Sequence, residues 1–168
     1  MKISEENKKE FIALVTELLT TKEVSEMKNY IQHGKTTTLE HCLAVAYTSY
    51  LAAQKLPFSF DYKSLVRGAM LHDFYLYDWH IREQSQRYHG FVHPTIAAKN
   101  AKNYFNLNQV EIDIIERHMW PLTFRKFPTK REVLLVCLVD KYCSFAETFY
   151  LSSLSKSTKA LFRLTFYL

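Results

Sequence analysis

The sequence of 168 residues is poor in the residues that interrupt helices, with three glycines and four prolines. Tight turns depend on such residues, so their scarcity predicts long helices joined at few points. No apolar run approaches the length of a membrane-spanning helix, and the apolar stretch 161–168 is short and contains Arg163. These absences predict a helical protein that does not interact with a membrane.

Cysteine is also scarce. Cys42, Cys137 and Cys143 lie in apolar stretches without a CxxC pair, and their odd number argues against a disulfide framework and for a reducing compartment. The first six residues contain no apolar region of the kind found in signal peptides. We therefore expect a cytoplasmic protein.

The composition is that of one globular domain over 1–168, with 48% hydrophobic and 15% aromatic residues. A formal charge of +5 suits an anionic small molecule. The lysines and arginines are scattered along the chain and form no cluster of the kind that binds a nucleic-acid polymer. The expected partner is a small anionic compound, and homodimerisation is left open.

The apolar periodicity predicts an all-α fold of about seven to eight helices. Three pairs have the spacing of a capping box, Thr37 with Glu40, Asn108 with Glu111 and Thr129 with Glu132, and Asp61 and Pro94 also mark helix starts. The polar residues 32–37 are expected to form a joint, and 74–92, which lacks a period, a functional lid. The expected helices cover residues 5–19, 22–30, 37–56, 61–72, 94–105, 108–118, 129–149 and 158–166.

Asp140 occupies the apolar face of its expected helix, three and four residues after Cys137 and Val136. A buried carboxylate must be paired or bound to a metal, because an unsatisfied ion in the interior costs several kcal/mol. Lys141 and Arg67 are the basic residues that would pair with it if no metal is bound. Both interpretations stay open at this point.

Four further polar residues occupy apolar helix positions in the same way. Taken alone, each would be a hydrogen-bonded core residue. Together they would need several unrelated buried partners, whereas one metal site satisfies them all, and imidazole with carboxylate suits iron, manganese, zinc and similar cations. The four residues are His41, His72, Asp73 and His118.

The order of these residues resembles the H…HD…D signature of the HD-domain metal-dependent phosphohydrolases. The flanking segments LEHCLAVAYTSYLAAQ, LVRGAMLHDF and VLLVCLVDKYCS match the helices that carry the ligands in that family, and the resemblance covers about residues 33–148. The segments HPTIAAKNA and IIERHMWP resemble those of binuclear members, which include the symmetrical dinucleoside-tetraphosphate hydrolases and the mixed-valent di-iron oxygenases. The glycine and lysine that follow HD in cyclic-dinucleotide phosphodiesterases are absent, so that activity is not expected.

The resemblance implies a helical bundle that binds one or two divalent ions, with iron or manganese favoured and zinc, magnesium, nickel or cobalt as alternatives. His41, His72, Asp73 and Asp140 would hold one ion, with Asp73 as a bridge. The second ion would be held by His93 and His118. His89 competes with His93 for this role, and we prefer His93 because Pro94 follows it.

The implied activity is hydrolysis of a phosphate ester or anhydride of a nucleotide or another small phosphorylated metabolite, by a hydroxide that the metal generates. Asp73 is expected to accept the water's proton and Lys141 to stabilise the phosphoryl charge. The alternatives are a di-iron oxygenase and a non-catalytic regulator that binds a nucleotide. The expected substrate-binding residues are His33, Lys35, Arg82 and Arg87, with Tyr77, Trp79 and Trp120 as candidates for stacking on a base.

Overall fold

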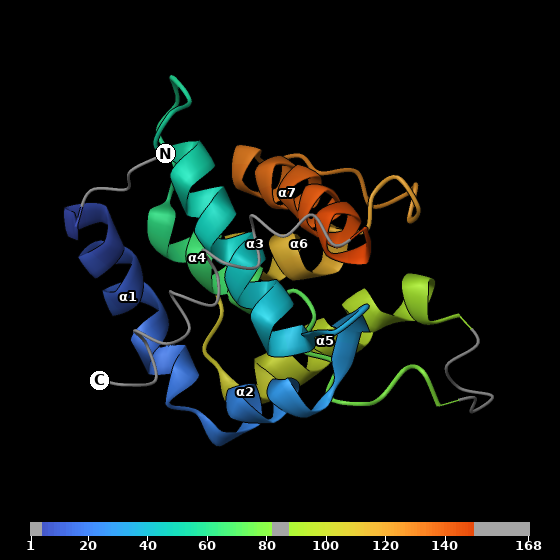
Figure 1. Cartoon of the computed structure of the whole chain (residues 1–168). Coiled ribbons are helices and arrows are strands. Elements are labelled where there is room, and N and C mark those ends of the chain that lie inside the picture. Colours follow the sequence, from blue (N-terminus) through green and yellow to red (C-terminus); the bar gives the residue numbers. More distant parts are fainter. Residues whose placement is uncertain (1–4, 82–87, 150–168) are drawn as a thin grey trace.

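The computed structural model describes residues 5–81 and 88–149, which are mainly helical (Figure 1). The expected all-α class is therefore confirmed. No helix in these two ranges is both long and apolar enough to cross a bilayer. The helix expected over 158–166 lies outside the described residues, as do Arg82 and Arg87. The described helices are α1 Glu5–Leu19, α2 Lys22–Glu26, the 3-10 helix η1 Met27–Asn29, α3 Thr38–Ala53, α4 Tyr62–Leu71, α5 His89–Tyr104, α6 Gln109–Arg117 and α7 Arg131–Thr148.

A short β-hairpin replaces the polar joint that was expected over 32–37. Strand β1 Ile31–His33 pairs antiparallel with β2 Thr36–Thr37. Gly34 in the turn has a φ of 57°, a left-handed conformation that glycine adopts without a steric penalty. The hairpin packs against α3 and α7 and so carries its polar residues to the side of the helical core.

Three of the five predicted helix-start signals are confirmed. Complete capping boxes open α3 at Thr37 and α6 at Asn108, and the Asp61 side chain caps α4. The prediction for Thr129 was wrong, because α7 has Lys130 as its N-cap and no side-chain cap.

The predicted start of α5 at Pro94 was also wrong. The helix already begins at His89, because the Tyr88 carbonyl accepts the N–H groups of Phe91 and Val92 and forms a first turn there. Pro94 therefore lies in the second turn, where its missing N–H removes one helix hydrogen bond.

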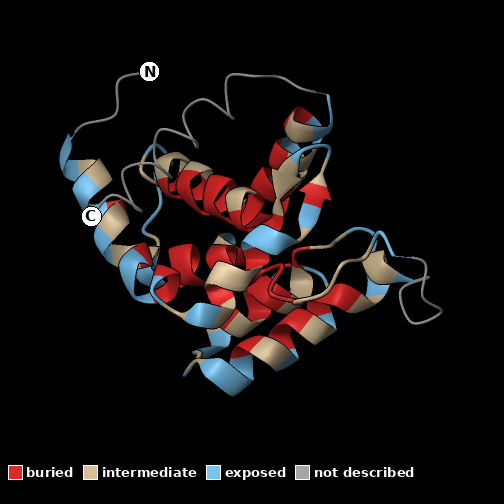
Figure 2. Ribbon diagram, turned by 60° about the horizontal axis from the view of Figure 1, so that its bottom comes forward, coloured by how far each residue is buried: buried red, intermediate tan, exposed pale blue. Residues whose placement is uncertain are grey.

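Helix α3 lies at the centre of the fold and packs against α4 and α7, while α4 also contacts α1 and α6. Figure 2 shows that the buried residues lie on the sides of the helices that face one another. Gly68 in α4 permits a close approach to α6, because a Cβ at this position would lie 2.7 Å from Ile114 Cδ1. This packing brings the C-terminal ends of α4 and α6 together, with the rings of His72 and His118 4.8 Å apart.

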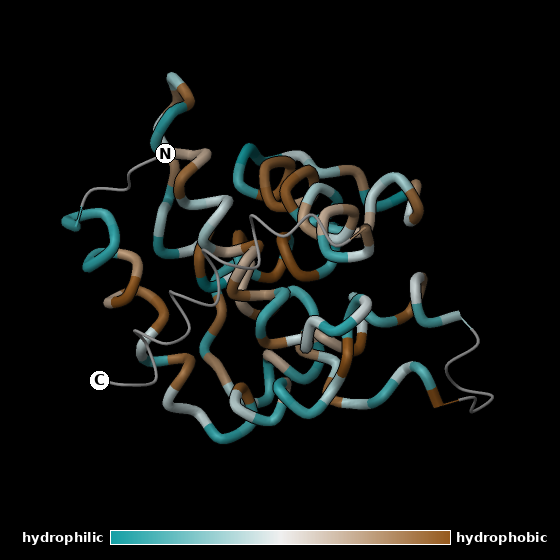
Figure 3. The backbone as a smooth tube through the Cα atoms, viewed as in Figure 1, coloured by the Kyte–Doolittle hydropathy of each residue, from teal (hydrophilic) through white to brown (hydrophobic). Residues whose placement is uncertain are grey.

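Helix α7 is apolar on its exposed side as well as on its buried side. Val133 and Val136 are buried against the core, whereas Leu138, Tyr142 and Phe145 are more than half exposed. Figure 3 shows hydrophobic residues along α7 and hydrophilic residues at the start of α1. Hydropathy alone therefore does not show which side of α7 faces the core.

Candidate metal centre

Six buried polar side chains meet at the point where five helices converge. His41 projects from α3, His93 from α5 and Asp140 from α7, while His72 and His118 are the C-cap residues of α4 and α6. Asp73 follows the C-cap of α4, so its side chain can also reach toward the neighbouring helices. The exposed fraction is at most 6% for each residue of the set His41, His72, Asp73, His93, His118 and Asp140.

Asp73 lies between two groups of imidazoles. Its Oδ2 is 3.4 Å from His72 Nε2 and 3.8 Å from His41 Nε2. Its Oδ1 is 3.1 Å from His93 Nε2 and 3.5 Å from His118 Nε2. Each oxygen therefore faces a different histidine pair, which is the arrangement of a carboxylate that bridges two cations.

Asp140 completes the group around Oδ2. Its Oδ1 is 3.1 Å from His41 Nε2 and 3.7 Å from His72 Nε2, and it also accepts a hydrogen bond from Ser144. The basic residues that were considered as its partners are engaged elsewhere. Arg67 pairs with Glu111, and the Lys141 ammonium donates to backbone carbonyls.

The histidines share one orientation, with Nε2 directed into the cluster and Nδ1 directed away from it. The Nδ1 atoms of His72, His93 and His118 lie 2.7–2.9 Å from the carbonyls of residues 69, 89 and 115. His41 Nδ1 lies 2.9 Å from Glu147 Oε2. A carbonyl or carboxylate can only accept a hydrogen bond, so Nδ1 carries the proton, and metal-binding histidines are commonly oriented by such partners.

Without a cation, the inner atoms of the cluster are poorly satisfied. His93 Nε2 and His118 Nε2 are 2.9 Å apart, and the tautomer set by their outer hydrogen bonds would make both acceptors. His72 Nε2 and Asp73 Oδ1 are buried without a hydrogen-bond partner. Three overlapping groups of these side chains have ligand atoms within 4.8 Å of one another. A buried set of imidazole and carboxylate donors left open in this way fits divalent cations.

The electrostatics favour the metal-binding protonation states of the carboxylates. Burial raises the pKa of the carboxyl groups of Asp73 and Asp140, but the neighbouring imidazoles outweigh this effect and hold each pKa well below its usual range. Burial lowers the pKa of His118 to about 4, so this imidazole is neutral at pH 7. Burial also lowers the pKa of His41, but hydrogen bonds to Asp140 and Glu147 outweigh it and raise the pKa to about 10.

The match to a known family is consistent with this geometry. The family model of the HD domain matches residues 38–144, well over half of the chain. The chain belongs to the HD domain family. Proteins of this family are generally metal-dependent phosphohydrolases and bind divalent metals. Neither a curated protein nor a solved structure was found to match the chain.

Sequence reasoning missed two side chains that support this HD domain's cluster from outside. Gln32 Nε2 donates to Asp73 Oδ2 at 2.5 Å, and its Oε1 accepts from Tyr75. Glu147 holds His41 as described above. Its position, seven residues after Asp140 on one helix, was a usable signal because residues i and i+7 share a helix face. Gln32 had no such signal, since it reaches the site through the hairpin.

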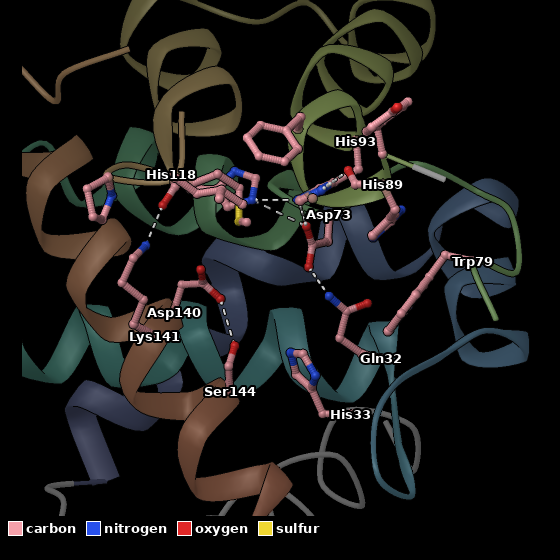
Figure 4. Close-up of a pocket in the computed structure, with 16 residues that line it drawn as sticks. Gln32, His33, Asp73, Trp79, His89, His93, His118, Asp140, Lys141 and Ser144 are labelled. Carbon is pink, nitrogen blue, oxygen red and sulfur yellow. Dashed lines mark hydrogen bonds and ion pairs between the residues drawn. The ribbon is translucent and has the colours of Figure 1, made fainter. Parts of the chain in front are cut away.

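Four residues of the cluster, Asp73, His93, His118 and Asp140, line a pocket of about 940 Å³ in the HD domain. Figure 4 shows Asp140 and Lys141 on one side of this pocket, Trp79 and His89 on the other, and Asp73 between them. His89 Nδ1 bonds the Tyr77 hydroxyl at 2.8 Å, outside the ligand groups. The structure therefore places His93, rather than His89, at the cluster.

The predicted substrate residues are dispersed. His33 lines the pocket with its ring 5.4 Å from that of His41, whereas Lys35 is exposed at the hairpin turn and does not line the pocket. Trp79 lines the pocket, but Trp120 packs against Phe127 instead. Arg82 and Arg87 lie outside the described residues.

Proposed function

We propose that this HD domain is a metal-dependent phosphohydrolase that cleaves a phosphate ester or anhydride of a nucleotide or other small phosphorylated metabolite. The observation that carries the proposal is the position of Asp73, whose two oxygens face separate histidine pairs at 3.1–3.8 Å. Membership of a family whose proteins generally perform this chemistry supports it.

Two ions, iron or manganese by preference, would share Asp73. The first would be held by His41, His72, Asp73 and Asp140, and the second by Asp73, His93 and His118. Divalent cations in such a site lower the pKa of a bound water and neutralise phosphoryl oxygens. Among the described residues the second set offers three protein ligands, so an ion held there could also accept water and substrate.

The chain's own residues would orient the reactants and move protons. In hydrolysis the water oxygen bonds to phosphorus, the bond from phosphorus to the leaving oxygen breaks, and a proton moves from the water to the leaving group. Asp140, ionised at neutral pH, would accept the water's proton, because the bridge would occupy both oxygens of Asp73. The Lys141 ammonium is held at the pocket wall by the His118 carbonyl at 2.9 Å and supplies a fixed positive charge for a phosphoryl oxygen.

The test combines metal analysis of the purified protein with a phosphate-release screen on nucleotides and simple phosphate esters. We expect activity that depends on a divalent ion, disappears in Asp73→Ala and persists in the control Glu116→Gln, which alters a carboxylate on the outside of α6 that pairs with Lys102. Absence of phosphate release from every ester by the metal-loaded protein would refute the proposal. No phosphate release in the screen, together with an activity that requires iron and O₂, would favour the oxygenase alternative.

A further inference from the structure

The half of the pocket that lies away from the cluster is apolar. Its side chains come from the segment before α5, from the first turn of α5 and from the loop that follows α6. The two sides pack closely at Gly90, where a Cβ would lie 3.1 Å from Leu122 Cδ2. The apolar lining consists of Trp79, Tyr88, Phe91, Met119, Pro121 and Leu122.

A continuous wall of flat rings runs from this apolar half to the cluster. The Trp79 ring stacks on His89 with centroids 5.0 Å apart and an interplanar angle of 10°. His89 stacks in turn on His93 at 4.6 Å and 18°. On the rim, Phe91 and Leu122 remain 54% and 47% exposed, so apolar surface that a ligand could cover is left facing solvent.

Positive charge is scarce in the same pocket. Among the described residues that line it, Lys141 carries the only Lys or Arg charge, and its ammonium already donates to the carbonyls of His118 and Cys137. Recognition of a polyphosphate chain typically uses several such groups. The described part of the pocket thus offers one centre for a phosphoryl group, at the cluster, and an apolar surface beside it.

We propose that the substrate is a phosphomonoester whose alcohol carries a flat apolar ring. The inference rests on the proposed function, since the phosphoryl group must lie at the cluster. The ring then lies in the apolar half, against the wall that Trp79 and His89 form. Hydrolysis breaks the bond from phosphorus to the alcohol oxygen, and the ring-bearing alcohol leaves with the proton that the water gives up.

The first arm of the test measures binding without turnover. Benzylphosphonate and methylphosphonate share the charged group and cannot be hydrolysed at their P–C bond, so their affinities for the metal-loaded protein differ through the ring alone. Titration calorimetry should give at least about tenfold tighter binding of benzylphosphonate, as expected for burial of several apolar carbons. Equal affinities within about twofold would overturn the proposal.

Variants of the rim test whether the apolar half of the pocket causes the preference for benzylphosphonate over methylphosphonate. Phe91→Ala and Leu122→Ala each remove a rim side chain that is not a candidate ligand, and each should reduce the preference for benzylphosphonate by about three- to tenfold. The matched control is Phe124→Ala, because Phe124 is 80% exposed and does not line the pocket. An equal loss of preference in Phe124→Ala, or no loss in either rim variant, would contradict the assignment.

The second arm separates this inference from the proposed function. Phosphate release is compared for benzyl phosphate, ethyl phosphate and ATP, the two alcohols being leaving groups of similar quality. We expect kcat/KM to be at least about tenfold higher for benzyl phosphate than for ethyl phosphate. If phosphate is released from benzyl phosphate and ethyl phosphate with equal kcat/KM, or if ATP is the preferred substrate, the inference is overturned and the proposed function stands. A benzylphosphonate preference without any phosphate release retains the ligand class and refutes the hydrolase.

Discussion

Glu147 gives the sharpest test of how the cluster is held together. Its Oε2 accepts the Nδ1–H of His41 at 2.9 Å, and its side chain is only 9% exposed. The bond fixes the tautomer of His41 and directs Nε2 toward Asp140 and Asp73. Glu147→Ala removes this hydrogen-bond partner and leaves all six candidate ligands in the sequence.

The expected effect is a 10–100-fold loss of metal affinity, the usual range when the outer partner of a ligating histidine is removed. That range corresponds to about 1.4–2.7 kcal/mol of binding free energy. Glu147→Gln keeps a carbonyl oxygen that can still accept from Nδ1–H, so it should lose only a few-fold.

The assay is competition of Mn²⁺ between the protein and a chelator of known affinity, with Glu116→Ala as the matched carboxylate deletion outside the cluster. Thermal unfolding of the metal-free variants checks that each one folds. A Glu147→Ala affinity within about twofold of that of the unaltered protein, or equal losses for Glu147→Ala and Glu116→Ala, would refute the reasoning.

Three further predictions concern packing, protonation and charge. Gly68→Ala should lower the free energy of unfolding in urea by about 1–3 kcal/mol, because its Cβ would meet Ile114 at 2.7 Å, whereas Gly90→Ala should change it far less; equal losses would contradict this. In the metal-free protein the pKa of His41 rises from about 6.5 to about 10, so its contribution to stability is complete below pH 6.5 and is lost as pH rises toward 10. Urea unfolding from pH 6 to 10 should show this decline, and it should be smaller in His41→Gln. Lys141→Met should lower kcat/KM for phosphate release about tenfold or more at unchanged metal content, and an unchanged kcat/KM would remove this lysine from the mechanism.

Sequence reasoning anticipated the parts of the fold that local chemistry determines. The capping boxes at Thr37 and Asn108 and the cap at Asp61 open their helices where expected, because each side chain bonds N–H groups within its own first turn. The predicted start of α5 at Pro94 was wrong because proline is preferred in the first turn of a helix but does not determine where the helix begins. The Tyr88 carbonyl instead accepts the first helix hydrogen bonds, and His89 in this earlier turn stacks on Trp79 and bonds the Tyr77 hydroxyl.

The convergence of the six polar residues was predictable for a similar reason. A charged or imidazole side chain at a core position of a helix must have its polar atoms satisfied. Ser144 for Asp140 and the Ile115 carbonyl for His118 are partners within the same helix, but they leave His118 Nε2 and part of the Asp140 carboxylate to be satisfied from neighbouring helices. Of the two outer contacts, that of Glu147 had a signal in its position on α7, whereas that of Gln32 was not predictable. Gln32 reaches Asp73 only because the hairpin folds back against α3, and no local pattern encodes that approach.

The central claim is that cations draw these side chains together, with Asp73 shared between two ions. Calorimetric titration of the metal-free protein with Mn²⁺ tests this most directly. The account predicts two ions per chain, one ion for His93→Ala, and loss of both high-affinity sites for Asp73→Ala. Binding of no ion by the folded protein, or a stoichiometry that His93→Ala and Asp73→Ala leave unchanged, would contradict it.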